Sequence, residues 1–182
     1  MTGSTPRVTP TDRRRTAGAG GREEKVSLTQ SASEHRHFED YIPGSVFEYG
    51  EVAVSEAEII DFARRFDPQA MHVDPVAAAR GRFDGLIASG WHTAAMMMRL
   101  LVDDFLPGRA SLASPGIDEL RWLRPVRPGD VLRVRVSVLE ATRSRSKPYR
   151  GIVRTLVEVL NQDAEVVMSM KPMNIIACRS DS

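Results

Sequence analysis

The stretch that decides the fold is Ser89–Phe105, which reads SGWHTAAMMMRLLVDDF. Large apolar side chains recur along it at helical spacing, and further apolar residues fill much of the remaining circumference. A helix that is apolar nearly all round is buried on most of its sides, so this stretch predicts a long core helix from about Gly90 to Phe105, with Ser89 as its N-cap. Charged residues interrupt the run before it reaches the roughly 20 apolar residues of a membrane span, so we expect no membrane partner.

The residues that follow this helix alternate between apolar and polar side chains, which is typical of strands with one buried face. We expect strands over residues 117–123, 131–141, 151–160 and 164–176, and one before the helix over residues 46–54. Pro172 suggests that the last strand lies at an edge or contains a bulge. One buried helix and a meander of strands predict an α+β fold in which an antiparallel sheet curves around the helix.

Between the first strand and the core helix, two shorter helices are expected. Ser55 and Glu58 form a capping box that starts a helix. Pro68 disfavours helical geometry in the residue before it, so this helix ends near Phe66. Asp74 is then an N-cap for a second short helix, because a proline at the first helical position follows it.

The whole chain has 182 residues, and its composition is that of one globular domain with a tail. Residues 1–37 are poor in large apolar residues, so we expect a disordered tail followed by a folded domain over residues 38–182. The 25 Lys and Arg nearly balance the 24 Asp and Glu, which argues against a nucleic-acid partner. A single cysteine excludes an intramolecular disulfide, and no secretory signal is visible, so we expect a cytoplasmic protein.

Asp67 and His72 are the strongest candidates for catalysis. A carboxylate at the C-terminal end of a helix is disfavoured by the helix dipole, so local structure does not require Asp67 there. An imidazole can accept or donate a proton near neutral pH. If both converge on one water, they can move protons to and from it. The alternatives are a turn residue before proline for Asp67 and an ordinary loop histidine for His72.

Ser89 and Gly90 open the core helix, and the first N–H groups of a helix have no internal partners. Directed at a carbonyl oxygen, these groups would form an oxyanion site, and glycine would allow a close approach. The alternative is an ordinary capped helix start.

A group of basic residues lies between two of the predicted strands. Its members are Arg143, Arg145, Lys147 and Arg150. Such a group could bind the phosphates of a substrate, and we assign Arg143, Arg145 and Lys147 to substrate binding on that basis. The alternative is a solvated hairpin tip.

The segment 67–75 resembles the hydratase motif of the MaoC-like hot-dog dehydratases, which include the (R)-specific enoyl-CoA hydratases. Their pattern is Asp-x-Asn-Pro-x-His-x-Asp-Pro. The chain matches it at Asp67, His72, Asp74 and Pro75. Gln69 and Ala70 replace the Asn-Pro pair. The resemblance continues through residues 83–90, 123–130 and 143–148 and covers about residues 40–177.

The resemblance implies a hot-dog fold that forms a homodimer or a higher homo-oligomer. It also implies that Asp67 and His72 are the catalytic pair and that the Gly90 N–H binds the thioester carbonyl. Ser89 stands where the family usually has histidine, so we place it among the substrate-binding residues. Met98 occupies a position where some members have a serine that contacts the catalytic aspartate.

The function we expect is that of a hydro-lyase, the reversible hydration of a trans-2-enoyl-CoA, or a related acyl thioester, to a 3-hydroxyacyl thioester. The resemblance implies an acyl-CoA or acyl-carrier substrate and neither a metal nor another cofactor. Two alternatives stay open. A hot-dog acyl-CoA thioesterase would use a carboxylate to activate water against the carbonyl, and a non-catalytic module would bind acyl-CoA without turnover.

Overall fold

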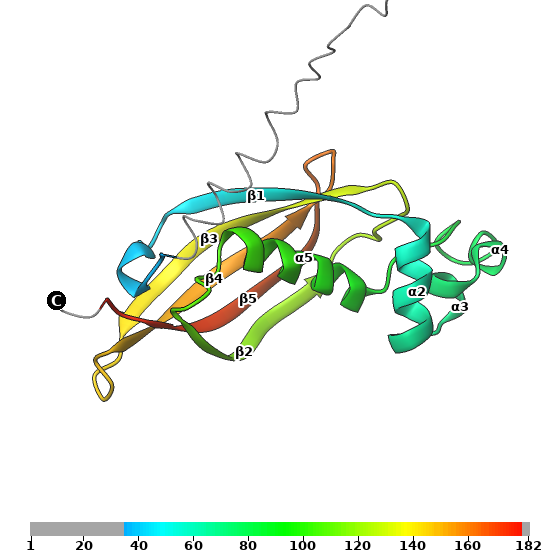
Figure 1. Cartoon of the computed structure of the whole chain (residues 1–182). Coiled ribbons are helices and arrows are strands. Elements are labelled where there is room, and N and C mark those ends of the chain that lie inside the picture. Colours follow the sequence, from blue (N-terminus) through cyan, green and yellow to red (C-terminus); the bar gives the residue numbers. More distant parts are fainter. Residues whose placement is uncertain (1–34, 180–182) are drawn as a thin grey trace, which may run out of the picture.

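The computed structural model describes residues 35–179, and all but the last three residues of the predicted tail lie outside that range. Residues 35–179 contain one antiparallel sheet of five strands in the order β1-β3-β4-β5-β2 (Figure 1). The strands are β1 (Val46–Ala53), β2 (Ser111–Trp122), β3 (Val131–Arg143), β4 (Arg150–Leu160) and β5 (Val166–Ala177). The sheet curves around the long helix α5 (Gly90–Asp104), which confirms the predicted α+β architecture (Figure 1).

The core lies between α5 and the concave face of the sheet. On β3 the side chains of Leu132, Val134, Val136 and Val138 are buried, while the residues between them are partly exposed. This is the alternation expected of a strand with one buried face. On the helix, Met97 and Leu101 are buried against the sheet. Trp91, Met98 and Val102 are exposed, so α5 is less buried than the apolar spacing predicted.

The short helices gather beyond one end of the sheet (Figure 1). They are α2 (Glu56–Phe66), α3 (Ala70–Val73) and α4 (Pro75–Ala78), and a 3-10 turn, η1 (Phe38–Asp40), precedes β1. The predicted caps are present: the Ser55 hydroxyl accepts from the Glu58 N–H, and the Asp74 carboxylate accepts from two N–H groups of α4. The helical turn α3 is a difference, since the sequence predicted irregular backbone there.

Two features of the strands depart from the prediction. β2 begins at Ser111, six residues before the expected start at 117. The prediction missed this first half because its side chains are exposed and show no alternation between buried and exposed positions. Pro172 lies in β5, an interior strand, so the edge position is wrong. Pro172 pairs with Ile117 of β2, and the pairing between β4 and β5 keeps the same register on both sides of the proline, so no bulge lies there either.

Arg36 contacts the domain although it falls within the predicted tail. Its guanidinium donates to the Phe105 carbonyl at 3.1 Å and to the Tyr49 hydroxyl at 2.9 Å. It also lies over the rings of Phe47, Tyr49 and Phe105. Contacts with the folded domain therefore begin before the predicted boundary at residue 38.

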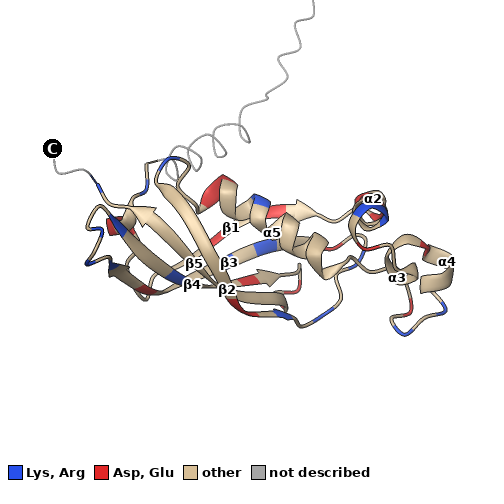
Figure 2. Ribbon diagram, turned by 90° about the horizontal axis from the view of Figure 1, so that it is seen from below, with Lys and Arg blue, Asp and Glu red and all other residues tan. Residues whose placement is uncertain are grey.

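The charged residues are spread over the domain. Figure 2 shows blue basic segments at both ends, around the turn between β3 and β4 and beyond α4. Across residues 35–179, no helix has the length and apolar character needed to cross a membrane.

Candidate active site

The end of α2 and the single turn of α3 bring Asp67 and His72 together. Asp67 is the C-cap of α2, and its N–H donates to the Ala63 carbonyl at 2.8 Å. The chain then turns through Pro68 into α3, which places His72 in a buried position with 4% of its surface exposed. The His72 Nε2 lies 3.5 Å from the Asp67 Oδ2. The carboxylate and the imidazole, which lie five residues apart in the sequence, therefore face each other.

The orientation of the His72 ring is fixed by the backbone. Its Nδ1 lies 2.8 Å from the Ile87 carbonyl oxygen, which can only accept a hydrogen bond. Nδ1 therefore carries a hydrogen, and in the neutral ring Nε2 has the free lone pair. The nitrogen that faces Asp67 is the one that can accept a proton.

Asp67 accepts hydrogen bonds on both carboxylate oxygens. The Gln69 amide donates to Oδ1 at 2.6 Å, and the Ser89 hydroxyl donates to Oδ2 at 2.7 Å. These two bonds, together with the nearby His72, hold the pKa of Asp67 below its usual value, against a smaller opposing effect of burial. Asp67 is therefore a carboxylate at neutral pH.

Ser89 has two roles at the start of α5. Its hydroxyl oxygen accepts from the Trp91 N–H at 3.2 Å, which confirms the predicted N-cap. The same hydroxyl donates to Asp67, so the residue that replaces the family histidine contacts the Asp67 carboxylate directly. Met98, at the position where some members have a serine, does not line the cavity that contains Asp67.

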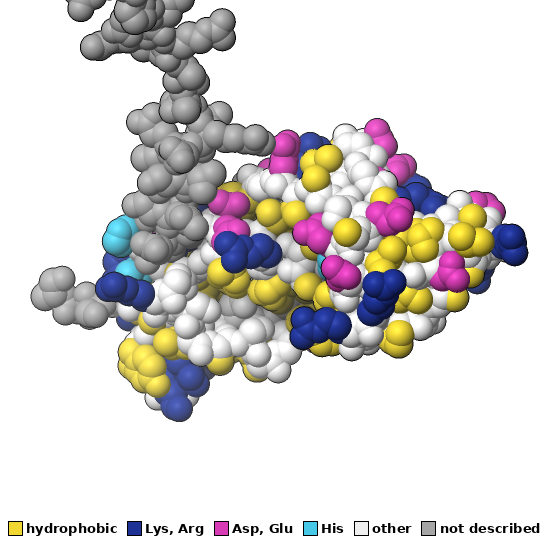
Figure 3. Space-filling model, turned by 45° about the vertical axis from the view of Figure 1, so that its right-hand side comes forward, with side chains coloured by type: hydrophobic (Ala, Val, Ile, Leu, Met, Phe, Trp, Pro, Cys, Tyr) yellow, Lys and Arg dark blue, Asp and Glu magenta, His cyan; other side chains and the backbone are white. Residues whose placement is uncertain are grey.

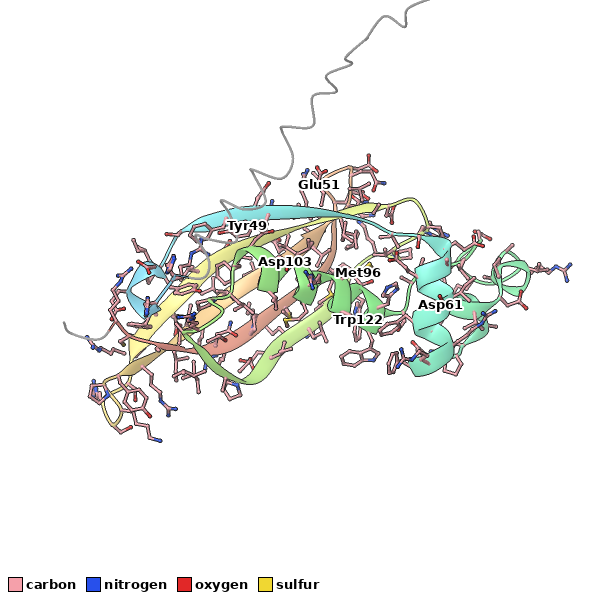
Figure 4. All side chains as sticks on the ribbon, in the orientation of Figure 1. Tyr49, Glu51, Asp61, Met96, Asp103 and Trp122 are labelled. Carbon is pink, nitrogen blue, oxygen red and sulfur yellow. The ribbon has the colours of Figure 1, made fainter. Side chains whose placement is uncertain are left out.

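Gly90 is the first residue of α5, and among the described residues its N–H has no hydrogen-bond acceptor. The indole of Trp122 lies directly over its Cα, and a Cβ at this position would overlap that ring. Figure 4 shows the Trp122 side chain at this end of the helix, beside α2. Only glycine fits beneath the indole while an unpaired N–H is kept at the helix start.

These residues line a cavity of about 350 Å³, here called the first cavity. Asp67, His72, Ser89 and Gly90 form its polar part. The rest of the wall is mostly apolar and comes from α3, the loop before α5, α5, the end of β2 with the segment after it, and β5. Its residues are Met71, Phe83, Ile87, Ala88, Trp91, Thr93, Trp122, Leu123, Arg124, Pro125, Val126 and Val167. A polar cluster at one side of an apolar cavity suits a ligand with one reactive end.

The predicted basic cluster lies elsewhere within the chain. Arg143 ends β3, and Arg145 and Lys147 belong to the turn between β3 and β4, at the opposite end of the sheet from α2 and α3 (Figure 1). The Arg143 guanidinium donates to the Pro148 carbonyl within the same turn. A single chain therefore does not bring these cations to the first cavity.

The structure adds Gln69 and Trp122, to which the sequence gave no site role, and it places Arg124 at the site, an arginine outside the predicted basic cluster. Gln69 contacts Asp67, Trp122 covers Gly90, and Arg124 lines the first cavity. Gln69 lies inside the motif, two residues after Asp67, so the sequence could have predicted that the two side chains lie close together. Nothing in the local sequence distinguishes Trp122 from a core tryptophan.

A family model described as a MaoC-like domain matches residues 39–160. The chain belongs to the MaoC-like family. The architecture described above is the hot-dog fold that the resemblance implied.

Two curated relatives are similar in sequence. The uncharacterized protein YdeM of Bacillus subtilis is 36% identical over 124 residues, which is 68% of this chain and 86% of that protein. The 3-hydroxyacyl-thioester dehydratase Z of Mycobacterium tuberculosis is 32% identical over 110 residues, which is 59% of this chain and 73% of that protein.

Two solved structures are similar in both sequence and fold. A MaoC-like dehydratase from Rhodospirillum rubrum is 43% identical, with a TM-score of 0.75 over 80% of this chain and 99% of that chain. The (R)-hydratase PhaJ1 from Pseudomonas aeruginosa is 28% identical, with a TM-score of 0.61 over 79% of this chain and 86% of that chain. This MaoC-like chain is therefore similar to hydratases and dehydratases.

Proposed function

We propose that the protein catalyses the reversible hydration of a trans-2-enoyl thioester, with coenzyme A as the carrier, to a 3-hydroxyacyl thioester. The observation that carries this proposal is the Asp67–His72 pair, facing across 3.5 Å at the wall of the first cavity. The names of its relatives, a 3-hydroxyacyl-thioester dehydratase and an (R)-hydratase, point to the same reaction class.

The charges of the pair suit a bound water. The ionised Asp67 carboxylate accepts hydrogen bonds, and the His72 Nε2 accepts one in the form of the ring whose Nε2 carries no hydrogen, so one water can donate one hydrogen to each. In hydration, one of the two groups takes a proton as the water oxygen attacks the β-carbon. The pair then returns a proton to the α-carbon, which leaves the enzyme unchanged. Because the two groups interact, we assign the acid and base roles to the pair as a unit.

Gly90 would stabilise the thioester oxygen. Attack at the β-carbon moves negative charge onto that oxygen as an enolate forms. An unpaired N–H at the start of α5 can donate to this oxygen, and the positive end of the helix dipole favours the charge. Trp122 over the Gly90 Cα limits where the substrate can enter.

We further propose a homodimer. Exposed apolar side chains form an apolar stripe along α5 and the edge strand β2, made of Trp91, Met98, Val102, Leu112, Ile117 and Trp122. Figure 3 shows apolar patches in yellow on this face. A partner that covers the stripe would remove its apolar surface from water, and pairing with the free edge of β2 would satisfy the unpaired backbone groups of that strand.

The reaction is tested with a panel of trans-2-enoyl-CoA substrates of increasing chain length. We expect loss of the enoyl absorbance without release of free thiol, and formation of the 3-hydroxyacyl product. Asp67→Asn should keep the fold and lose about 10²–10⁴-fold of the rate, the range for one acid–base group.

Two results would contradict the proposal. Release of free coenzyme A from saturated acyl-CoA, blocked by Asp67→Asn, would identify a thioesterase instead. Tight binding of every thioester with no conversion would identify a binding module.

A further inference from the structure

Ser89 lies where the loop before α5 becomes the helix, and 0% of its surface is exposed. A serine hydroxyl has one hydrogen to donate, and this one goes to the Asp67 Oδ2 at 2.7 Å. The hydroxyl oxygen accepts from the Trp91 N–H at 3.2 Å. A buried hydroxyl whose hydrogen is already used has nothing left to donate to a substrate, so its contribution to the site is the contact with Asp67.

The two donors to the Asp67 carboxylate come from different parts of the chain. Gln69 is exposed and lies two residues after Asp67, so its bond stays within one short segment. Ser89 is 22 residues away in the sequence and belongs to the start of α5. Among the hydrogen bonds found within residues 35–179, the one from Ser89 is therefore the bond that joins this carboxylate to the helix.

The spacing between Asp67 and the helix start matters for the proposed reaction. Conjugation keeps the carbonyl oxygen and the β-carbon of an enoyl thioester at a fixed separation. The Gly90 N–H that would bind the oxygen and the pair that would act on the β-carbon must therefore keep a fixed spacing as well. The Ser89 hydroxyl bonds to the carboxylate on one side and to the first turn of the helix on the other.

We propose that Ser89 is a positioning residue that acts through Asp67: its hydroxyl holds the carboxylate at a fixed place relative to the Gly90 N–H. This inference rests on the proposed hydration reaction, and it gives Ser89 a role other than substrate binding. Because Ser89 is the N-cap, its hydroxyl also bonds to the helix start, a link that a serine at the position of Met98, farther along α5, would not have.

Ser89→Ala tests the proposal in the full chain by steady-state kinetics with an enoyl-CoA substrate. We expect kcat to fall about 10–100-fold, the cost of a misplaced reacting group, and KM to stay unchanged because the hydroxyl does not touch substrate. The Ser89 hydrogen bond helps to lower the pKa of Asp67, so the acid limb of the kcat/KM profile should move to higher pH. In an Asp67→Asn background, Ser89→Ala should cause no further loss of kcat.

Ser55→Ala is the matched control for the loss of a helix cap. Ser55 is the N-cap of α2, and its hydroxyl accepts from the Glu58 N–H at the same 3.2 Å. Both variants should lower the melting temperature by about 2–4 °C, but Ser55→Ala should keep the wild-type kcat and pH profile. If Ser89→Ala does not fold, Ser89→Gly removes the same donor and keeps a good N-cap residue.

A folded Ser89 variant with the wild-type pH profile, or one that loses as much kcat in the Asp67→Asn background as alone, would overturn the inference. The pKa of the Asp67 carboxyl group, followed by carbon NMR without substrate, keeps the proposed reaction separate. A pKa that rises in Ser89→Ala, in a protein that hydrates no enoyl-CoA, would disprove the reaction and retain the link between Ser89 and Asp67.

Discussion

The N-terminal end of α5 opens on the first cavity, whereas its C-terminal end is enclosed by aromatic side chains. At the open end, the Gly90 N–H has no acceptor among the described residues. At the closed end, the Phe105 carbonyl accepts hydrogen bonds from Tyr41 and Arg36, and the Phe105 ring packs edge-on against Tyr41. One helix thus keeps donors available for chemistry at one end and satisfies its acceptors for stability at the other.

The largest expected effect is at the open end. His72→Gln removes the group that can accept a proton and keeps a side chain that can still donate to the Ile87 carbonyl. We expect kcat for enoyl-CoA hydration to fall about 10²–10⁴-fold, while the melting temperature stays within a few degrees of the wild type. Combining it with Asp67→Asn should cost far less than the product of the single losses, because both groups act on one water. A near wild-type rate in the folded single variant would refute the catalytic role.

At the closed end, the expected effect is on stability. Tyr41→Ala removes a buried ring from the cluster around Phe105, and we expect the free energy of unfolding to fall by about 3–5 kcal/mol, the range for a buried aromatic. Tyr41→Phe, which loses only the hydrogen bond to Phe105, should cost about 1 kcal/mol. Chemical denaturation measures both. If Tyr41→Ala instead lowered kcat and left stability unchanged, the two ends would not be separate in function.

Gly90→Ala should damage the open end by a steric route. The new methyl group would overlap the Trp122 ring, so either the indole or the helix start must move. A displacement of about 1 Å at a reacting group can cost up to about 100-fold in rate, and we expect kcat to fall by up to that factor. Adding Trp122→Ala should restore part of the loss. No rescue would mean that Trp122 is not the cause.

Truncation sharpens the picture of the closed end. Deleting residues 1–34, a segment poor in large apolar residues, should leave the melting temperature unchanged. Deleting residues 1–36 also removes Arg36, with its hydrogen bonds to Phe105 and Tyr49, but keeps His37, the N-cap of η1, and should cost about 1–2 kcal/mol. Equal stability of the two truncated proteins would show that Arg36 contributes nothing.

The smallest effect concerns pH. The pKa of Asp67 is lowered chiefly by the Gln69 hydrogen bond, so Gln69→Leu should raise that pKa, which carbon NMR of the carboxyl group can follow. A lowered pKa stabilises the fold above the unfolded-state pKa, and this contribution is lost as the pH falls through the folded-state pKa. The stability difference between wild type and Gln69→Leu should therefore shrink in acid. An unchanged pKa would assign the shift to Ser89 and His72.

The sequence predicted most of the fold because its signals are local. Apolar spacing along α5 and alternation along β3 both follow from which side of an element is buried. The first half of β2 escaped prediction because it is exposed and has no alternation. The interior position of Pro172 could not be read locally, since which strands lie beside β5 depends on the whole chain.

The candidate site was predictable in part for the same reason. Asp67, His72, Ser89 and Gly90 lie in two short segments, and the structure brings them together at the first cavity. The prediction that Arg143, Arg145 and Lys147 bind substrate rests on the density of positive charge in that segment, and charge density carries no information on the distance from Asp67. Arg124, by contrast, lines the cavity although it lies outside that cluster. Only the folded chain shows which cations are near the site.

The position of Trp122 over Gly90 has a practical consequence for spectroscopy. The chain has two tryptophans, Trp91 and Trp122, and their rings meet edge-on with centroids 5.3 Å apart at the wall of the first cavity. Intrinsic tryptophan emission therefore originates at this site and nowhere else in the protein. A ligand that enters beside Gly90 displaces water from both indoles, so its arrival can be followed in real time without any attached label.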